Sequence, residues 1–471
     1  MDADTITAVA TPIGSGGIGI IKISGQKALT IAKSIFRKSP HITADPLASN
    51  SSWPSALQSH RLYHGYIVDS EKGRVLDEVL LSVMLAPHTY TKEDVVEINT
   101  HSGHVVLAST LDLVLRHGAR LAEPGEFTKR AYLNGRIDLT QAEAVIDIIN
   151  SRTDKALQVA ASQIKGDLKR RVESIRGVLL DILTETEAAI DFPEDIEDVI
   201  NTEAAAAVIT DQVMAALKDL LQQHEEARVF RDGLKLAVVG KPNVGKSSLM
   251  NRLLQSDRAI VTSIPGTTRD LIEETLNIRG IPVVVADTAG LHETDNPVEI
   301  IGIQKTKEYI NGADLILFMV AAGEPWSREE FEIYETIHHK NLILVVNKID
   351  LVAEGFEPEI PDSWKHVPRI QISALYSRGL NELKDLIARA AVGDYRLEPG
   401  NTIIPNRRHK MALQRSLELA SSAVDEIRKQ TPFELIAIDL QEAIDALGEI
   451  IGLTAREDVL DQIFSRFCIG K

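Results

Sequence analysis

The chain has 471 residues, 44% of them hydrophobic, and a formal net charge of −17. A chain of this length exceeds one hydrophobic core, and about 150 residues per domain predicts roughly three domains. The negative charge argues against a protein that binds nucleic acid over its whole surface, because neutralising phosphates needs lysine and arginine; a local basic patch stays open.

The sequence predicts a soluble, cytoplasmic protein. Its single cysteine permits no internal disulfide, which is usual in a reducing compartment. The N-terminus carries Asp2 and Asp4 where a signal peptide needs positive charge. No unbroken apolar run reaches the ~18 residues of a membrane helix.

The pattern of residues 1–135 indicates an α+β domain. Short apolar or β-branched runs between turn-forming residues predict strands at Ile18–Ile23, Tyr63–Val68, Val79–Met84 and Val95–Ile98. Helical spacing predicts a helix at Leu107–Leu115, and the Pro- and Ser-containing stretch 39–59 predicts a surface loop.

Two segments with helical periodicity, 136–230 and 394–471, flank a segment of alternating strands and helices at 231–393. An acidic run at 191–198 predicts a turn between helices. The economical interpretation is one all-α domain interrupted by an inserted α/β domain, because domains accept insertions at loops whose ends are close. Two independent helical domains would fit the same pattern.

A phosphate-binding loop begins the α/β segment. The apolar run Leu234–Val239 precedes Gly240-Lys241-Pro242-Asn243-Val244-Gly245-Lys246-Ser247, and a helix-compatible stretch follows, which is the context of a P-loop. Lys246 would bridge the β- and γ-phosphates and Ser247 would ligand Mg²⁺. The predicted nucleotide contacts are Asn243, Val244, Gly245, Lys246, Ser247 and Ser248.

Two further motifs follow in the order of a GTPase. Asp287-Thr288-Ala289-Gly290 comes after the predicted strand Val283–Ala286, so Asp287 would hold Mg²⁺ through water and the Gly290 N–H would meet the γ-phosphate. Thr268 is the predicted second hydroxyl ligand of Mg²⁺. It ends a segment of predicted nucleotide contacts formed by Thr262, Ser263, Ile264, Pro265, Gly266, Thr267 and Thr268.

The base-recognition residues predict GTP rather than ATP. Asn347-Lys348-Ile349-Asp350 follows the predicted strand Leu342–Val346, and the Asp350 carboxylate would accept from N1–H and the 2-amino group of guanine. Adenine lacks this pair of donors and would leave a buried charge unpaired, which is costly. Ser373 and Ala374, after a predicted strand at 369–372, would direct backbone N–H groups toward guanine O6.

The residue after the Asp-x-x-Gly motif is Leu291, where a Ras-type enzyme has a glutamine that orients the attacking water. Hydrolysis therefore needs another group, and the nearby carboxylates are Glu293, Asp295 and Glu299; a solvated acidic loop is the alternative interpretation. A monovalent cation could supply the missing charge, with Asn243 as a suitable oxygen ligand.

Together these motifs resemble the tRNA-modification GTPase family MnmE (TrmE). The resemblance covers the whole chain and includes Gly266-Thr267-Thr268-Arg269-Asp270, Asp287-Thr288-Ala289-Gly290-Leu291, Pro124-Gly125-Glu126-Phe127-Thr128 and the terminal Cys468-Ile469-Gly470-Lys471. It implies a homodimer whose N-terminal domains, residues 1–135, pair and bind 5-formyl- or 5,10-methylene-tetrahydrofolate. It also favours the inserted-domain interpretation and implies G domains that dimerise in the presence of K⁺.

The resemblance further implies that a flavoprotein partner of the MnmG type joins this chain. The pair would add an aminomethyl or carboxymethylaminomethyl group to C5 of the wobble uridine (U34) of certain tRNAs. Carried onto this sequence, Glu299 would orient the water and Ser247 and Thr268 would hold Mg²⁺. The implied K⁺ ligands are Asn243, Thr262, Ile264 and Thr267, and the implied folate contacts are Lys22, Glu97, Arg136 and Lys471.

Cys468 is a candidate nucleophile, because a thiolate adding to uridine C6 would activate C5. The alternative is a small apolar residue packed beside Phe467.

Two other functions would account for some of the motifs in this sequence. An RNA-binding ribosome-assembly GTPase can carry the same G motifs, but usually with an RNA-binding appendage instead of a folate-type N-terminus. A folate-dependent transferase with a degenerate G domain is opposed by the intact nucleotide motifs.

Overall fold

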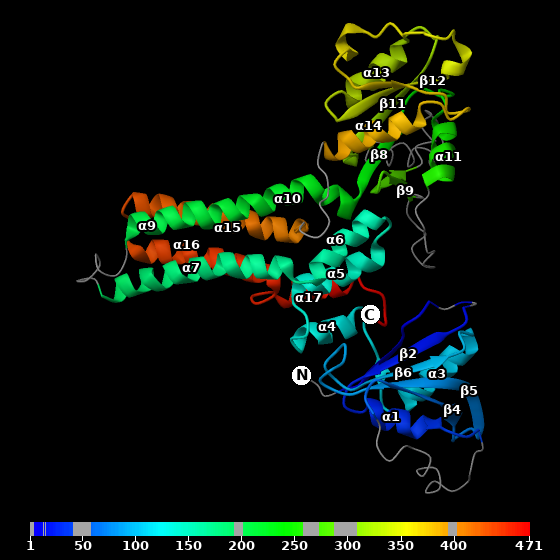
Figure 1. The fold of residues 1–471 in the computed structure, drawn as a ribbon, viewed down its shortest axis with the longest axis vertical. Coiled ribbons are helices and arrows are strands. Elements are labelled where there is room, and N and C mark those ends of the chain that lie inside the picture. The colour runs from blue at the N-terminus through cyan, green and yellow to red at the C-terminus, as the bar shows by residue number, and fades with distance from the viewer. Residues whose placement is uncertain are drawn as a thin grey trace, which may run out of the picture. The chain divides into compact units, whose positions relative to one another are not determined.

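The structure is a computed structural model that describes residues 4–12, 14, 16–40, 58–192, 201–257, 273–286, 309–393 and 403–471 (Figure 1). The chain divides into two units, Met1–Ile146 with Gly448–Lys471, and Asp147–Leu447. The first unit therefore contains both ends of the chain, and the second contains everything between them.

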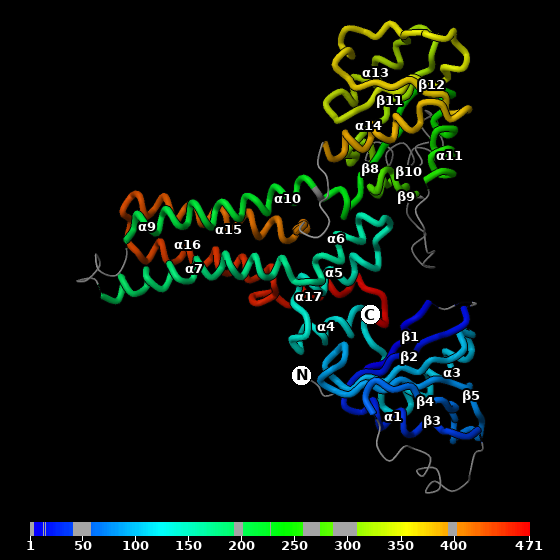
Figure 2. The backbone as a smooth tube through the Cα atoms, viewed as in Figure 1, coloured from blue at the N-terminus to red at the C-terminus, as the bar shows by residue number. Residues whose placement is uncertain are grey.

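The described strands of the first unit form a mixed sheet in the order β3-β4-β5-β6-β2-β1-β7. Figure 2 labels β1 to β5 of this sheet, in the blue part of the chain. Their bounds are β1 Ile6–Val9, β2 Gly19–Ser24, β3 Phe36–Arg37, β4 Arg61–Asp69, β5 Arg74–Met84, β6 Val95–Thr100 and β7 Arg120–Leu121. Neighbouring strands are antiparallel, except that β1 and β7 are parallel. Helices α1 (Ala28–Ile35) and α3 (His104–Arg116) contact the sheet and share its apolar core.

The C-terminal end of the chain packs within this unit. Three helices form an apolar cluster there: α4 (Glu126–Leu133), α5 (Leu139–Asn150) and α17 (Glu457–Phe464). The Phe127 backbone N–H donates to the Lys471 carbonyl at 3.2 Å. Gly470 has φ 96°, and a Cβ there would lie 2.6 Å from the Val9 carbonyl oxygen. The last residues of the chain therefore need a glycine to lie against β1.

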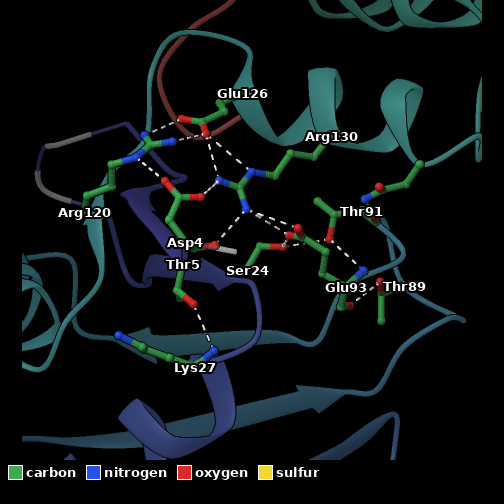
Figure 3. A network of polar contacts seen from close by, with 11 residues as sticks. Asp4, Thr5, Ser24, Lys27, Thr89, Thr91, Glu93, Arg120, Glu126 and Arg130 are labelled. Carbon is green, nitrogen blue, oxygen red and sulfur yellow. Dashed lines mark hydrogen bonds and ion pairs between the residues drawn. The ribbon is translucent and has the colours of Figure 1, made fainter. Parts of the chain in front are cut away.

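A network of charged side chains ties α4 to the sheet (Figure 3). Arg130 Nη2 lies 2.6 Å from Asp4 Oδ1 and 3.0 Å from Glu126 Oε1, while Arg130 Nη1 lies 3.1 Å from Glu93 Oε1. Arg120 donates to Glu126 and to Asp4 as well. Burial alone would lower the pKa of Arg130, but the hydrogen bond from Arg130 to Glu126 and the charge of Glu93 outweigh it, so the pKa is raised. The guanidinium is thus held as a cation by three carboxylates.

The same network fixes the loop between β5 and β6 (Figure 3). Ser24 Oγ donates to Glu93 Oε2 at 2.7 Å and lies 2.7 Å from Thr91 Oγ1. Thr89 Oγ1 donates to the Glu93 carbonyl at 2.6 Å. Tyr90 therefore lies between Thr89 and Thr91, whose hydroxyl groups both form hydrogen bonds.

Helices from both sides of the α/β segment form one body in the second unit. They are α6 (Asp154–Ile164), α7 (Asp167–Asp191), α9 (Thr202–Val208), the π-helix η3 (Ile209–Met214), α10 (Ala215–Asp232), α15 (Arg407–Arg428) and α16 (Phe433–Ile451). Helix α15 contacts α9, η3 and α10 (Figure 1). Where the chain returns, His224 Nδ1 lies 2.5 Å from the Pro405 carbonyl oxygen, and Gln163 Nε2 donates to the Ile404 carbonyl at 2.6 Å. The prediction of one helical domain interrupted by an inserted domain is confirmed. The alternative of two independent helical domains is wrong.

The described strands of the inserted domain form a sheet in the order β13-β12-β11-β8-β10-β9, parallel except for β9. Their bounds are β8 Leu234–Val239, β9 Glu273–Ile278, β10 Ile281–Ala286, β11 Leu315–Ala321, β12 Leu342–Asn347 and β13 Arg369–Gln371. The helices are α11 (Lys246–Asp257), α13 (Arg328–Ile337) and α14 (Leu380–Val392), with 3₁₀ turns η4 (Ile349–Leu351) and η5 (Asp362–Trp364).

Strand β11 shows why this sheet is covered on both faces. Its residues are all buried, and alternate side chains enter different clusters. Leu317 joins the cluster that contains α11 and α14, whereas Phe318 joins the cluster that contains α13 and Trp364. A parallel strand with helices on both sides therefore appears in the sequence as an unbroken apolar run.

The predicted N-terminal strands are confirmed as β2, β4, β5 and β6, and the predicted helix at 107–115 as part of α3. Helix α4 was not predicted, because Glu126 and Thr128 are buried in it and break the apolar pattern. The predicted loop at 39–59 and turn at 191–198 lie largely outside the described residues. Within the described ranges, no helix has both the length and the hydrophobicity to cross a bilayer.

Arg130→Met is expected to destabilise the first unit by about 3–5 kcal/mol, because three carboxylates lose a shared, largely buried cation. Calorimetry of the full chain measures the loss, and hydrogen exchange in α4 assigns it to this unit. Arg328→Met is the matched control, since the Arg328 side chain is 93% exposed and pairs only with Glu332 among its described ion pairs. It should cost at most about 0.5 kcal/mol. Equal losses in both variants would contradict the supporting role of the network.

Candidate functional site

The candidate nucleotide site lies at the carboxyl edge of the parallel strands. The phosphate-binding loop follows β8, and α11 begins directly after it at Lys246. Gly245 has φ 102°, and a Cβ there would lie 2.2 Å from Asn347 Nδ2. A Cβ at Gly240 would lie 2.2 Å from the Met319 carbonyl oxygen. Both positions exclude a side chain, which lets the loop pack directly against β11 and β12.

Lys246 lies over the loop that precedes it. Its Nζ donates to the carbonyls of Gly240 and Lys241, at 2.7 and 2.8 Å. Burial lowers the pKa of Lys246, and the charge of Glu329 acts in the opposite direction. An ammonium has three donors, so these two bonds leave one for a phosphate oxygen.

The remaining predicted P-loop contacts have different exposures. Val244 is buried, whereas Ser247 and Ser248, which open α11, are exposed. Asn243 is exposed too and has φ 64°, a left-handed conformation that asparagine tolerates better than most residues. The Asn243 side chain is accessible to a ligand at the surface of the loop.

Asn347 joins the P-loop to the Ser373–Ala374 turn. This residue is 3% exposed at the end of β12. Its Nδ2 donates to the Val244 carbonyl at 2.7 Å, and its Oδ1 accepts from the Ala374 N–H at 2.9 Å. The Ala374 N–H, which the sequence assigns to guanine O6, is thus bonded to Asn347 in this structure. One amide holds the P-loop and the Ser373–Ala374 turn at a fixed separation.

Asp350 is oriented by its neighbours. It lies in η4, which begins after Lys348 in a left-handed conformation, φ 67°. Ser373 Oγ donates to Asp350 Oδ1 at 2.5 Å. Arg252 of α11 donates to the Leu375 carbonyl at 2.8 Å, which supports the same turn from the other side. The carboxylate that would select guanine is therefore pre-positioned.

Several predicted site residues lie outside the described residues. They are Thr262, Ser263, Ile264, Pro265, Gly266, Thr267, Thr268, Asp287, Thr288, Ala289, Gly290, Glu293, Asp295 and Glu299. The predicted Mg²⁺ ligand Thr268, three of the predicted K⁺ ligands and the candidate water-orienting carboxylates thus remain sequence predictions. The described part of the site consists of the phosphate-binding loop and the base-recognition residues.

A second candidate site lies in the first unit, where β2 and β6 pair Lys22 with Glu97. Lys22 Nζ lies 3.7 Å from Glu97 Oε1, 5.7 Å from the centroid of the Tyr90 ring and 5.4 Å from that of Phe127. Burial lowers the pKa of Lys22, Glu97 opposes this effect, and the charge of Lys471 adds to it. A cation between aromatic rings, next to a carboxylate, is suited to a flat polar ring system.

The other predicted folate contacts lie around this pair. Arg136 Cζ lies 4.9 Å from the centroid of the Tyr90 ring, on the same side chain that Lys22 approaches. Lys471 is close enough to affect Lys22 electrostatically. Cys468, three residues earlier, is exposed and free, while Phe467 is buried. The structure therefore brings together Lys22, Glu97 and Lys471 and links Arg136 to them through Tyr90.

Sequence reasoning missed the residues that support these sites. Tyr90 and Phe127 flank Lys22, and Arg252 holds a turn 123 positions away in the chain. Lys241, inside the P-loop, pairs with the buried Glu330 at 3.2 Å. Phe127 and Lys241 stood in motifs that the sequence singled out, but the contacts of all these residues join positions far apart in the chain.

Two family models match the chain. Residues 5–136 match a model described as the N-terminus of the GTP-binding protein TrmE, and residues 139–468 match one described as the MnmE helical domain. Together the two matches account for nearly all of the chain.

Relatives along the whole length are named tRNA modification GTPase MnmE. The protein of Desulfotalea psychrophila is 46% identical over 100% of this chain and 99% of its own length. That of Thermoanaerobacter pseudethanolicus is 46% identical over 99% of each chain, and that of Staphylococcus aureus 41% over 100% of each. A solved structure of Aquifex aeolicus Era bound to GDP·AlF4⁻ is 29% identical over 39% of this chain and 67% of its own, with a TM-score of 0.27.

Asn347→Ala is expected to weaken guanine-nucleotide binding by about 10- to 100-fold, because the Val244 carbonyl and the Ala374 N–H lose a buried partner worth ~1–3 kcal/mol together. Fluorescence titration of the full chain with labelled GDP measures the change. Asn341→Ala is the control, because Asn341 is an exposed asparagine that directly precedes the first residue of β12. Its affinity should stay within about twofold of wild type. An unchanged affinity in Asn347→Ala would refute the role of the bridge.

Proposed function

Because this chain belongs to the tRNA modification GTPase MnmE family, we propose that it is a cytoplasmic GTPase that modifies C5 of the wobble uridine (U34) of certain tRNAs. A tetrahydrofolate would supply the one-carbon unit, and the product would be an aminomethyl- or carboxymethylaminomethyl-uridine. The chain would act as a homodimer with a flavoprotein partner of the MnmG type.

The observation that carries the GTP part of this proposal is the Asn347 bridge. Its two hydrogen bonds place the P-loop beside the turn that orients Asp350. A carboxylate held in this way complements the N1–H and 2-amino donors of guanine. Lys246 would contact the phosphates, and Ser247 would contact Mg²⁺.

The folate part is supported by the Lys22–Glu97 pair. Glu97 offers acceptors for the amino edge of a pterin, and Lys22 lies near two aromatic rings that could flank it. Arg136 and Lys471 would bind the carboxylates of the folate. When bound, the folate would supply a carbon at the formaldehyde or formate oxidation level, and the residues of this chain would orient it.

We assign K⁺ stimulation to the P-loop. Asn243 has a left-handed backbone conformation. Because the residue is exposed, its side-chain oxygen is accessible to a cation. Backbone oxygens of Thr262, Ile264 and Thr267 would complete the coordination. The cation would supply positive charge next to the phosphates, and Glu299 would orient the attacking water, since Leu291 has no polar side-chain atom to do so.

Cys468 remains our candidate nucleophile toward uridine C6, because it is exposed and lies three residues from Lys471. Attack of its thiolate would form an S–C6 bond at the expense of the C5=C6 π bond and make C5 nucleophilic toward the one-carbon unit. Loss of the C5 proton would then expel the thiolate and restore the double bond. The ribosome-assembly GTPase is not retained as an alternative, because the relatives that match this chain do so from its N-terminal domain to its C-terminal end.

The decisive experiment is mass spectrometry of U34 nucleosides from a strain that lacks this gene. The modified uridine should disappear, and the wild-type gene should restore it. A gene with Lys246→Ala should not, since phosphate binding is lost. Normal U34 modification in the deletion strain would refute the proposal.

Glu299→Ala should bind GTP normally but hydrolyse it about 10²–10⁴-fold more slowly, the loss typical of a removed general base or water-positioning group. Steady-state GTPase assays in KCl, with nucleotide affinity measured in parallel, separate the two effects. Glu293→Ala and Asp295→Ala serve as controls and should retain turnover. If either control loses activity while Glu299→Ala keeps it, the role belongs to that residue instead.

A further inference from the structure

A surface cavity of the first unit is lined by eight described residues, of which four are basic. Its volume is about 490 Å³, within the range of small-molecule sites. The described residues that line it include His60, His88, Lys92 and Arg136, and none of the described lining residues is acidic. In a chain with a net charge of −17, this local excess of basic side chains indicates a site for an anion.

The two permanent cations of the cavity are held in place with donors to spare. Lys92 Nζ donates to the Gly135 carbonyl at 3.0 Å, and Arg136 Nη1 donates to the Tyr90 carbonyl at 3.2 Å. These bonds join the loop before β6 to the turn after α4. A lysine has three N–H donors and an arginine five, so both can also bind carboxylates.

The backbone of the cavity is strained. Seven non-glycine residues in the described part of the chain have positive φ. Asn243 and Lys348 belong to the nucleotide site, and His60 (φ 60°) and Lys92 (φ 58°) line this cavity. Such conformations are costly and cluster at ligand sites, so their presence in both places supports a binding role.

The cavity adjoins the candidate folate site. Tyr90 lines it, and the same ring lies 5.7 Å from Lys22 Nζ and 4.9 Å from Arg136 Cζ. A folate with its pterin at Lys22 and Glu97, and its glutamate at Arg136, would extend past Tyr90. Any residue attached to that glutamate would enter the cavity.

We propose that this cavity binds the oligo-γ-glutamate tail of a folate, so that the protein prefers polyglutamyl folates; the inference rests on the folate binding proposed above. The first γ-linked glutamate adds a carboxylate for Lys92, and each added glutamate brings two methylenes, which suit the apolar walls Met84 and Pro87. RNA phosphates would also suit the basic residues. The tail is favoured because Tyr90 is shared with the Lys22 site.

The test compares 5-formyl-tetrahydrofolate carrying one or three glutamates, by calorimetric titration of the full chain. The triglutamate should bind about three- to fivefold more tightly, as expected from one additional exposed ion pair with Lys92. Lys92→Met should reduce this preference to about twofold or less and leave monoglutamate affinity within about twofold of wild type.

Lys72→Met is the matched control. Lys72 is an exposed lysine in the β4–β5 turn. The cavity residues His60 and Met84 lie at the opposite end of the same hairpin. The nine residues of β4 separate the two ends by about 30 Å. It should keep the full preference.

The outcomes separate the two proposals. Equal affinities for both folates would overturn the tail site and leave folate binding intact, whereas no binding of either folate would overturn the proposed folate function itself. If Lys72→Met and Lys92→Met lost the preference for the triglutamate equally, the preference would come from the general surface charge. That result would overturn the cavity as the binding site of the tail. A loss of tRNA affinity in Lys92→Met without a glutamate preference would assign the cavity to RNA phosphates.

Discussion

The buried guanidinium of Arg130 is the constraint on which the first unit depends. A cation removed from water needs carboxylates around it, and here they come from the N-terminal residue Asp4, the β5–β6 loop residue Glu93 and the α4 residue Glu126. Satisfying one charge therefore fixes three segments that are far apart in the chain. The network favours this arrangement, because moving any of the three segments takes a carboxylate away from the largely buried Arg130.

This constraint reaches the candidate folate site directly. Glu93 anchors the loop that supplies Tyr90 and Lys92, and Glu126 begins the helix that supplies Phe127. The surroundings of Lys22 are thus consequences of where Arg130 is neutralised. The two rings are also held by contacts of their own: Phe127 is buried in an apolar cluster against which Tyr90 packs, and the Tyr90 hydroxyl lies 3.0 Å from Thr128 Oγ1.

The nucleotide site uses neutral groups for a comparable purpose. The Asn347 amide has a donor and an acceptor, so one side chain can satisfy the Val244 carbonyl and the Ala374 N–H together. Gly245 allows the loop to come within reach, because a Cβ there would overlap Asn347. The bridge is short and buried, which explains how the P-loop and the Ser373–Ala374 turn, far apart in the chain, meet with little freedom.

The sequence alone determined the features that depend on local pattern. Apolar runs located β8 and β12, and the residues that follow them identified Lys246 and Asp350, because short motifs place their own chemistry at the ends of strands. Only the tertiary structure decided the features that depend on distant charges. Helix α4 escaped prediction because its buried side chains are polar, and the basic cavity beside Tyr90 exists only once the β5–β6 loop meets the turn after α4. Electrostatic and hydrogen-bond satisfaction between segments leaves no periodic trace in the sequence.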